Sequence, residues 1–68
     1  MSLKKRSFSL SGHRTSVALE EEFWAVLDAA AEGKSLAALV GQIDARRGTR
    51  PLASALRLHA LALVRAGA

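Results

Sequence analysis

The chain has 68 residues, half of them hydrophobic, with a net charge of +4 and no cysteine. A chain this short forms one domain with a small core, since it buries only ~60% of its unfolded surface. Because it has no cysteine, it lacks disulfides and thiolate metal sites, as expected of a cytoplasmic protein. Its apolar residues exceed what a monomer of this size can hide, so a homodimer is expected.

The positive charge is concentrated at the N-terminal end. Residues 1–19 contain four bases and no acid, whereas the rest of the chain contains six of each. The four bases are Lys4, Lys5, Arg6 and Arg14. Residues 1–12 are predicted to be a basic arm that can be extended, and residues 13–68 to be the folded domain. Such an arm attracts a polyanion, although a solvated tail is an equally good interpretation of its first bases.

Residues 14–19 alternate in character and are predicted to form a short β-strand, preceded by a turn or bulge at Gly12-His13. One face of this strand can pack on helices and carries Thr15, Val17 and Leu19. The other face is basic or small and carries Arg14, Ser16 and Ala18. Because a single strand has no partner in its own chain, it is expected to pair with the same strand of a second copy.

The first of three predicted helices covers about residues 20–32. It begins at consecutive glutamates, which suit the positive end of a helix dipole, and Gly33 suits its end as a left-handed cap. The expected buried stripe follows helical spacing and consists of Phe23, Val26, Leu27 and Ala30. Trp24 is expected in the core or at a dimer contact rather than stacked on a base.

Two further helices are predicted over about residues 35–47 and 51–66. Ser35 is expected to cap the second helix, whose apolar stripe consists of Leu36, Leu39, Val40 and Ile43. Arg46 and Arg47 suit its last turn, and Gly48 its end. The third helix is apolar on several faces, which predicts that it wraps a second subunit or closes the core of a dimer.

Enzymatic, metal-binding and membrane functions find no support in the sequence. His13 and His59 lack the spacing of a metal site, and the glutamates at residues 20–22 are interpreted as dipole partners rather than as a catalytic pair. Residues 52–66 are too short and too polar to span a bilayer. No catalytic residue, metal, cofactor or membrane partner is therefore expected.

The order of strand, helix, Gly-x-Ser turn and helix resembles that of the ribbon-helix-helix DNA-binding proteins of bacteria. Five segments resemble a short alphaproteobacterial group of that family: Gly12–Ser16, Leu19–Glu20, Phe23–Trp24, Ile43–Asp44 and Ala53–Arg57. The resemblance implies a mainly α fold with one short N-terminal strand and a third C-terminal helix. It also implies a homodimer whose two strands form an intermolecular antiparallel ribbon.

The resemblance further implies sequence-specific binding of double-stranded DNA by a small transcriptional regulator. In the major groove, base edges would be read by Arg14, Ser16 and Ala18. These residues are chosen because they lie on the side of the strand opposite to Val17 and Leu19. The resemblance places a phosphate at the start of the second helix, on Gly33, Lys34 and Ser35, where free amides suit an anion. An ordinary turn with a serine cap explains Gly33 and Ser35 equally well. Nonspecific DNA contacts are expected from Lys4, Lys5, Arg6 and His13.

Two alternative functions remain open from the sequence. The first is a protein-interaction module, similar to an antitoxin, that keeps the fold and restrains an unknown protein partner without reading DNA. Its support is the apolar surplus of the third helix. The second is an amphipathic membrane-surface protein, but the third helix lacks the row of lysine and arginine residues that such proteins use.

Overall fold

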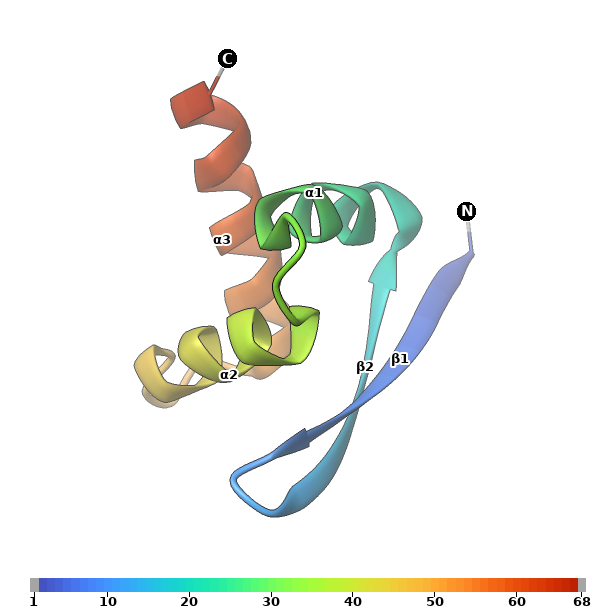
Figure 1. The fold of residues 1–68 in the computed structure, drawn as a ribbon, viewed down its shortest axis with the longest axis vertical. Coiled ribbons are helices and arrows are strands. Elements are labelled where there is room, and N and C mark those ends of the chain that lie inside the picture. Colours follow the sequence, from blue (N-terminus) through green and yellow to red (C-terminus); the bar gives the residue numbers. More distant parts are fainter. Residues whose placement is uncertain (1, 68) are drawn as a thin grey trace.

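The computed structural model describes residues 2–67, which form a two-stranded antiparallel sheet followed by three helices (Figure 1). The elements are β1 (Leu3–Leu10), β2 (His13–Glu20), α1 (Glu21–Ala31), α2 (Leu36–Arg46) and α3 (Leu52–Gly67). This order confirms the predicted class, a mainly α ribbon-helix-helix protein with a third C-terminal helix, but the chain has two N-terminal strands where one was predicted.

Both strands of the ribbon come from one chain, so the prediction that a second copy supplies the partner strand is wrong in this structure. β1 pairs with β2 in a register that runs from Leu3 opposite Glu20 to Leu10 opposite His13. The connection is the two-residue turn Ser11–Gly12, whose φ angles are 52° and 81°. Positive φ at both residues is what a two-residue hairpin turn of type I′ requires, and the twist of this turn matches the twist of the strands.

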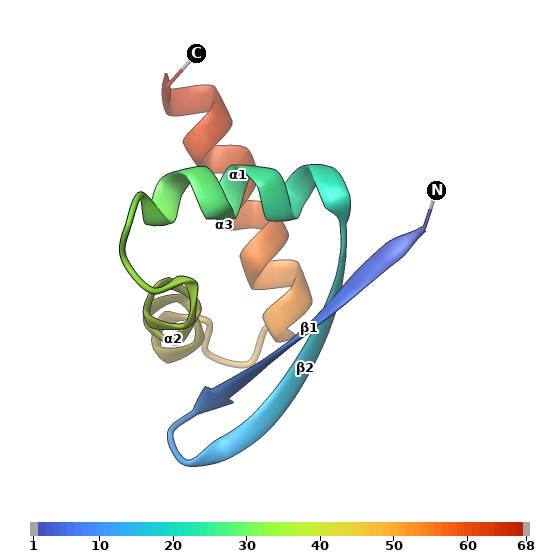
Figure 2. The same ribbon diagram turned by 45° about the vertical axis from the view of Figure 1, so that its right-hand side comes forward.

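The ribbon is curved and lays one face on the helices (Figures 1 and 2). The strand residues buried on that face are Phe8, Leu10, Val17 and Leu19. They alternate with exposed or half-buried residues, which confirms the predicted parity of β2. The helices complete the core with Trp24, Leu27 and Ala31 from α1, Val40 and Ile43 from α2, and Ala55, Leu56 and Ala60 from α3.

The buried stripe of α1 differs from the predicted one. Leu27 is fully buried as expected and Phe23 is half-buried, but Ala30 is exposed, while Trp24 and Ala31 are buried. The reason is that the ribbon covers the Trp24 side of the helix, where the indole lies 5.9 Å from the Phe8 ring, centroid to centroid. The core position expected for Trp24 is therefore confirmed.

The ends of the helices follow the local sequence signals. Ser35 caps α2, because its hydroxyl accepts a hydrogen bond from the Ala38 amide at 3.4 Å. α2 ends just before Gly48, which has a φ of 61°. α3 starts directly after Pro51, whose carbonyl accepts from the Ala55 amide at 3.0 Å.

α3 packs one face on the core and leaves large apolar side chains exposed on another. Leu58, Leu61 and Val64 are 46%, 47% and 50% exposed. Within residues 2–67, no helix combines the length and the apolar character needed to cross a membrane.

Candidate nucleic-acid interface

The face of the ribbon that points away from the helices gathers basic, hydroxyl and small side chains. Residues that pair across antiparallel strands share one face, and four pairs have this parity: Lys5 with Ala18, Ser7 with Ser16, Ser9 with Arg14, and Leu3 with Glu20 at the open end of the ribbon. We call the six residues of the first three pairs the outward face. All are exposed except Ala18, which is half-buried. The structure therefore brings the predicted base readers Arg14, Ser16 and Ala18 together on one accessible surface.

The chemistry of the outward face suits a nucleic acid. It offers two cations and three hydroxyl groups, and the carboxylate that shares its parity is that of Glu20, opposite Leu3 at the open end of the ribbon. Across the strands, the hydroxyl oxygens of Ser7 and Ser16 lie 2.9 Å apart and share a hydrogen bond. Guanidinium and hydroxyl groups are donors that can pair with base edges and phosphates.

The carboxylate at the end of the outward face is paired with a basic residue. Glu20, the last residue of β2, accepts a hydrogen bond from Nε of Arg57 at 2.9 Å. The pKa of Glu20 lies below its ordinary value, first because its own backbone amide donates to the carboxylate and second because Arg57 does. This carboxylate therefore stays ionised and paired, and it adds little repulsion toward an anionic partner.

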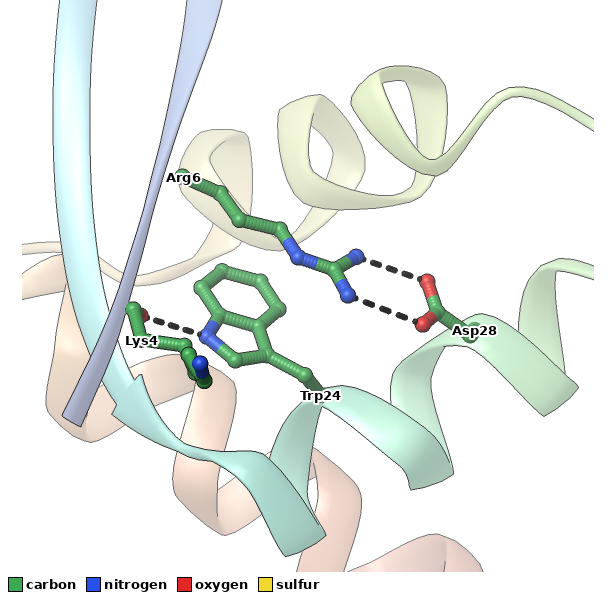
Figure 3. A network of polar contacts seen from close by, with 4 residues as sticks. All are labelled: Lys4, Arg6, Trp24 and Asp28. Atoms are coloured by element: carbon green, nitrogen blue, oxygen red, sulfur yellow. Dashed lines mark hydrogen bonds and ion pairs between the residues drawn. The ribbon is translucent and has the colours of Figure 1, made fainter. Parts of the chain in front are cut away.

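A second basic group, Arg6, lies on the helix side of the ribbon (Figure 3). Its two terminal nitrogens donate to the two carboxylate oxygens of Asp28 at 2.9 and 3.1 Å. The guanidinium carbon also lies 4.8 Å from the centroid of the Trp24 ring, and the Trp24 Nε1–H donates to the Lys4 carbonyl at 2.7 Å. These contacts fasten β1 to α1, so the structure does not bring Arg6 to the outward face where a DNA contact was expected.

The other residues expected to make nonspecific contacts divide between the two faces. Lys5 belongs to the outward face, whereas Lys4 and His13 pair with Leu19 and Leu10 and therefore have the opposite parity. Both remain exposed at the ends of the ribbon.

The turn between α1 and α2 contains the three residues that the resemblance assigned to phosphate binding. Gly33, Lys34 and Ser35 are all exposed. Gly33 has a φ of 78°, a conformation that favours glycine, and the Lys34 amide donates to the Ala31 carbonyl at 2.9 Å. The turn lies at the end of α1 remote from β2 (Figure 2). The predicted base readers and the predicted phosphate residues thus form two separate surfaces joined by α1.

Ser7 and Ser9 belong to the outward face, and sequence reasoning missed them. Their alternation with Phe8 and Leu10 indicated an extended segment. Because the two-residue turn at Ser11–Gly12 folds this segment back on β2, the two serines lie on the same face as Arg14 and Ser16. In the described part of the chain, residues 2–67, histidine and acidic side chains form no cluster suited to a metal ion.

Comparison with known proteins supports this architecture. A family model described as the ribbon-helix-helix domain matches residues 3–64, whereas no curated protein and no solved structure matches the chain. Members of that family generally bind DNA as dimers and serve as transcription regulators or antitoxins, and they are typically not enzymes. Because the match covers nearly the whole chain, this protein belongs to the ribbon-helix-helix domain family.

Proposed function

We propose that this protein binds double-stranded DNA sequence-specifically as a homodimer and acts as a small transcriptional regulator in the bacterial cytoplasm. The observation that carries the proposal is the outward face, which is polar, basic and accessible along a two-stranded ribbon. A major groove about 12 Å wide admits such a ribbon. Family membership supports the same conclusion.

Each side chain of the outward face has a role in this proposal. Arg14 makes a bidentate contact to guanine, Ser16 donates or accepts at a base edge, and Ala18 meets a thymine methyl group. Lys5 pairs with a backbone phosphate, and Ser7 and Ser9, which also lie on β1, add hydroxyl contacts. The phosphate contacts set affinity and register, whereas the base contacts set specificity.

The turn between α1 and α2 supplies a further phosphate contact in this proposal. The first amides of a helix lack partners within the helix and carry the positive end of its dipole. Lys34 adds a full charge beside them. The turn lies at the end of α1 remote from the junction with β2, and a helix of 11 residues is ~16 Å long.

The exposed apolar side chains of α3 support the homodimer. Leu61 and Val64 are about half exposed, and burying them against a second copy would remove apolar area from water. The ribbon is already complete within each chain, so a dimer would present two ribbons related by a twofold axis. Its DNA site would then have dyad symmetry.

Removal of the Arg14 side chain tests the assignment of the base readers. The Arg14→Ala variant should bind its preferred duplex about 1–3 kcal/mol more weakly and should discriminate less between sequences. Arg50→Ala is the matched control, because it removes an equal charge from an exposed position between α2 and α3, outside the outward face and outside the α3 face assigned to the dimer. Gel shifts over a salt series measure both properties. Equal effects of the two variants would show that Arg14 contributes charge alone.

Lys34→Ala tests the phosphate assignment in the same assay. It should weaken binding to all duplexes alike and reduce the slope of log K against log salt by about 1. An unchanged slope would remove the turn from the DNA site.

The exposed face of α3 also favours a second candidate function, a protein-interaction module that keeps the fold without reading DNA. Such a module would bury Leu58, Leu61 and Val64 against a partner protein. DNA binding with a steep salt dependence and a sequence preference discriminates between the two functions, because a pure interaction module shows neither.

A further inference from the structure

A groove between the end of α2 and the start of α3 has no part in the proposed DNA site. Its volume is about 900 Å³. Leu39, Ile43 and Ala55 form an apolar floor, while Arg46 and Arg50 stand at the rim. In Figure 1 the connection between α2 and α3 lies at the left of the helices, away from the junction of β2 with α1.

The charge of this groove is entirely positive among the described residues that line it. The closest acid in sequence, Asp44, is held by Nε of Arg47 at 2.6 Å. Arg47 also donates to the Arg50 carbonyl at 2.8 Å, which braces the connection between the helices. Arg46 and Arg50 are exposed and make no ion pair with any residue of the range 2–67. Two guanidinium groups therefore face solvent, without a counter-charge, beside a groove whose lining is part apolar and part polar.

This combination selects one chemical class of ligand. Pockets for small molecules typically have volumes of about 300–1,000 Å³ and combine apolar walls with a few placed polar groups. Arginine is suited to planar carboxylate and to phosphate oxygens. An inorganic anion would leave the floor of Leu39, Ile43 and Ala55 uncovered, and a neutral apolar molecule would leave the arginines without a partner. We propose that the groove binds an organic anion in which a carboxylate or phosphate ester is attached to a short aliphatic chain.

Three probes with the same tail test the charge requirement. Isotope-labelled protein is titrated with octanoate, octylamine or octanol at constant ionic strength, and backbone amide shifts are followed by NMR. Octanoate should shift the amides of Gln42, Arg46, Thr49 and Ser54, all of which line the groove. Octylamine and octanol should bind about tenfold more weakly or worse, because they forfeit the charge-assisted hydrogen bonds. Hexanoate should bind about two- to fourfold more weakly for each methylene removed.

Charge-matched variants locate the site. Arg46→Gln and Arg50→Gln should each weaken octanoate binding about fivefold or more, whereas Arg65→Gln, which removes the same charge outside the groove, should not. All three positions are exposed, so circular dichroism is expected to show an unchanged fold. Neither the probes nor the readout involves DNA, so failure of this proposal would leave the DNA proposal standing.

Several results would overturn the proposal. Equal binding of octanoate and octanol, or shifts confined to the exposed Leu61 and Val64, would show nonspecific apolar binding. Equal weakening by Arg65→Gln would show a general charge effect. Binding of an amphipathic glutamate-rich helical peptide without binding of octanoate would identify a protein-docking surface instead.

Discussion

The turn of the hairpin offers a direct test of the intrachain ribbon, because one substitution at two glycines should have opposite effects. Gly12 has a φ of 81°, and a Cβ added there would meet no atom within 4 Å, so Gly12→Ala acts only through the backbone. An L-residue in the left-handed region costs about 1–2 kcal/mol, and the lower entropy of the unfolded chain offsets about 0.4–1 kcal/mol of that cost. The net expectation is a destabilisation of about 1 kcal/mol.

Gly41→Ala is the matched control. Gly41 lies inside α2, and an added Cβ would be 3.9 Å from Leu10 Cδ2, an ordinary contact. Alanine inside a helix should stabilise the protein by about 0.5–1 kcal/mol. Urea unfolding, followed by circular dichroism at a fixed protein concentration, measures both changes. If Gly12→Ala stabilised the protein as Gly41→Ala does, Gly12 would not adopt the left-handed conformation of the hairpin turn in solution, and a ribbon formed between two chains would regain support.

Two further predictions concern the contacts that hold the ribbon to the helices. Trp24→Phe removes the donor to the Lys4 carbonyl and part of a fully buried side chain, so it should destabilise the fold by about 1–3 kcal/mol; full stability in urea unfolding would contradict the role given to the indole. Glu20 has a pKa below its ordinary value of 4.5, so its contribution to stability is complete above about pH 4.5 and is lost as the pH falls through the folded-state value. Glu20→Gln should therefore lose less stability than the wild type below about pH 4.5, and parallel acid unfolding curves would refute this prediction.

The sequence predicted the helices well, because their ends carry local signals. Ser35 and Gly48 mark the two ends of α2, and the structure places them as expected. The face that each helix buries depends instead on what packs against it. The stripe predicted for α1 included Ala30 because helical spacing alone cannot reveal that the ribbon covers the side of Trp24.

The largest error of the sequence-based prediction concerned the partner of β2, which was expected to come from a second chain. The serines that alternate with Phe8 and Leu10 indicate an extended segment, but alternation does not say which chain supplies the opposite strand. The signal that decides it is that only two residues, Ser11 and Gly12, separate the two extended segments, a spacing typical of a tight hairpin. The parity of Arg14, Ser16 and Ala18 was predicted correctly, since it follows from the burial of Val17 and Leu19 whichever strand pairs with them.

Arg6 shows a second limit of the sequence. A base in a basic run is expected to face solvent or an anion, yet its partner Asp28 lies 22 positions away and is brought close only by the packing of β1 on α1. The charge that the outward face presents is therefore carried by Lys5 and Arg14 rather than by the whole run.

Selection of bound duplexes from a random pool at physiological salt tests the central claim most directly. If the outward face reads bases in the major groove of a dimer's target, the selected sequences will share a motif with dyad symmetry, and Arg14→Ala will lose that enrichment. A pool that shows no enrichment over its starting composition would contradict sequence-specific recognition by the ribbon.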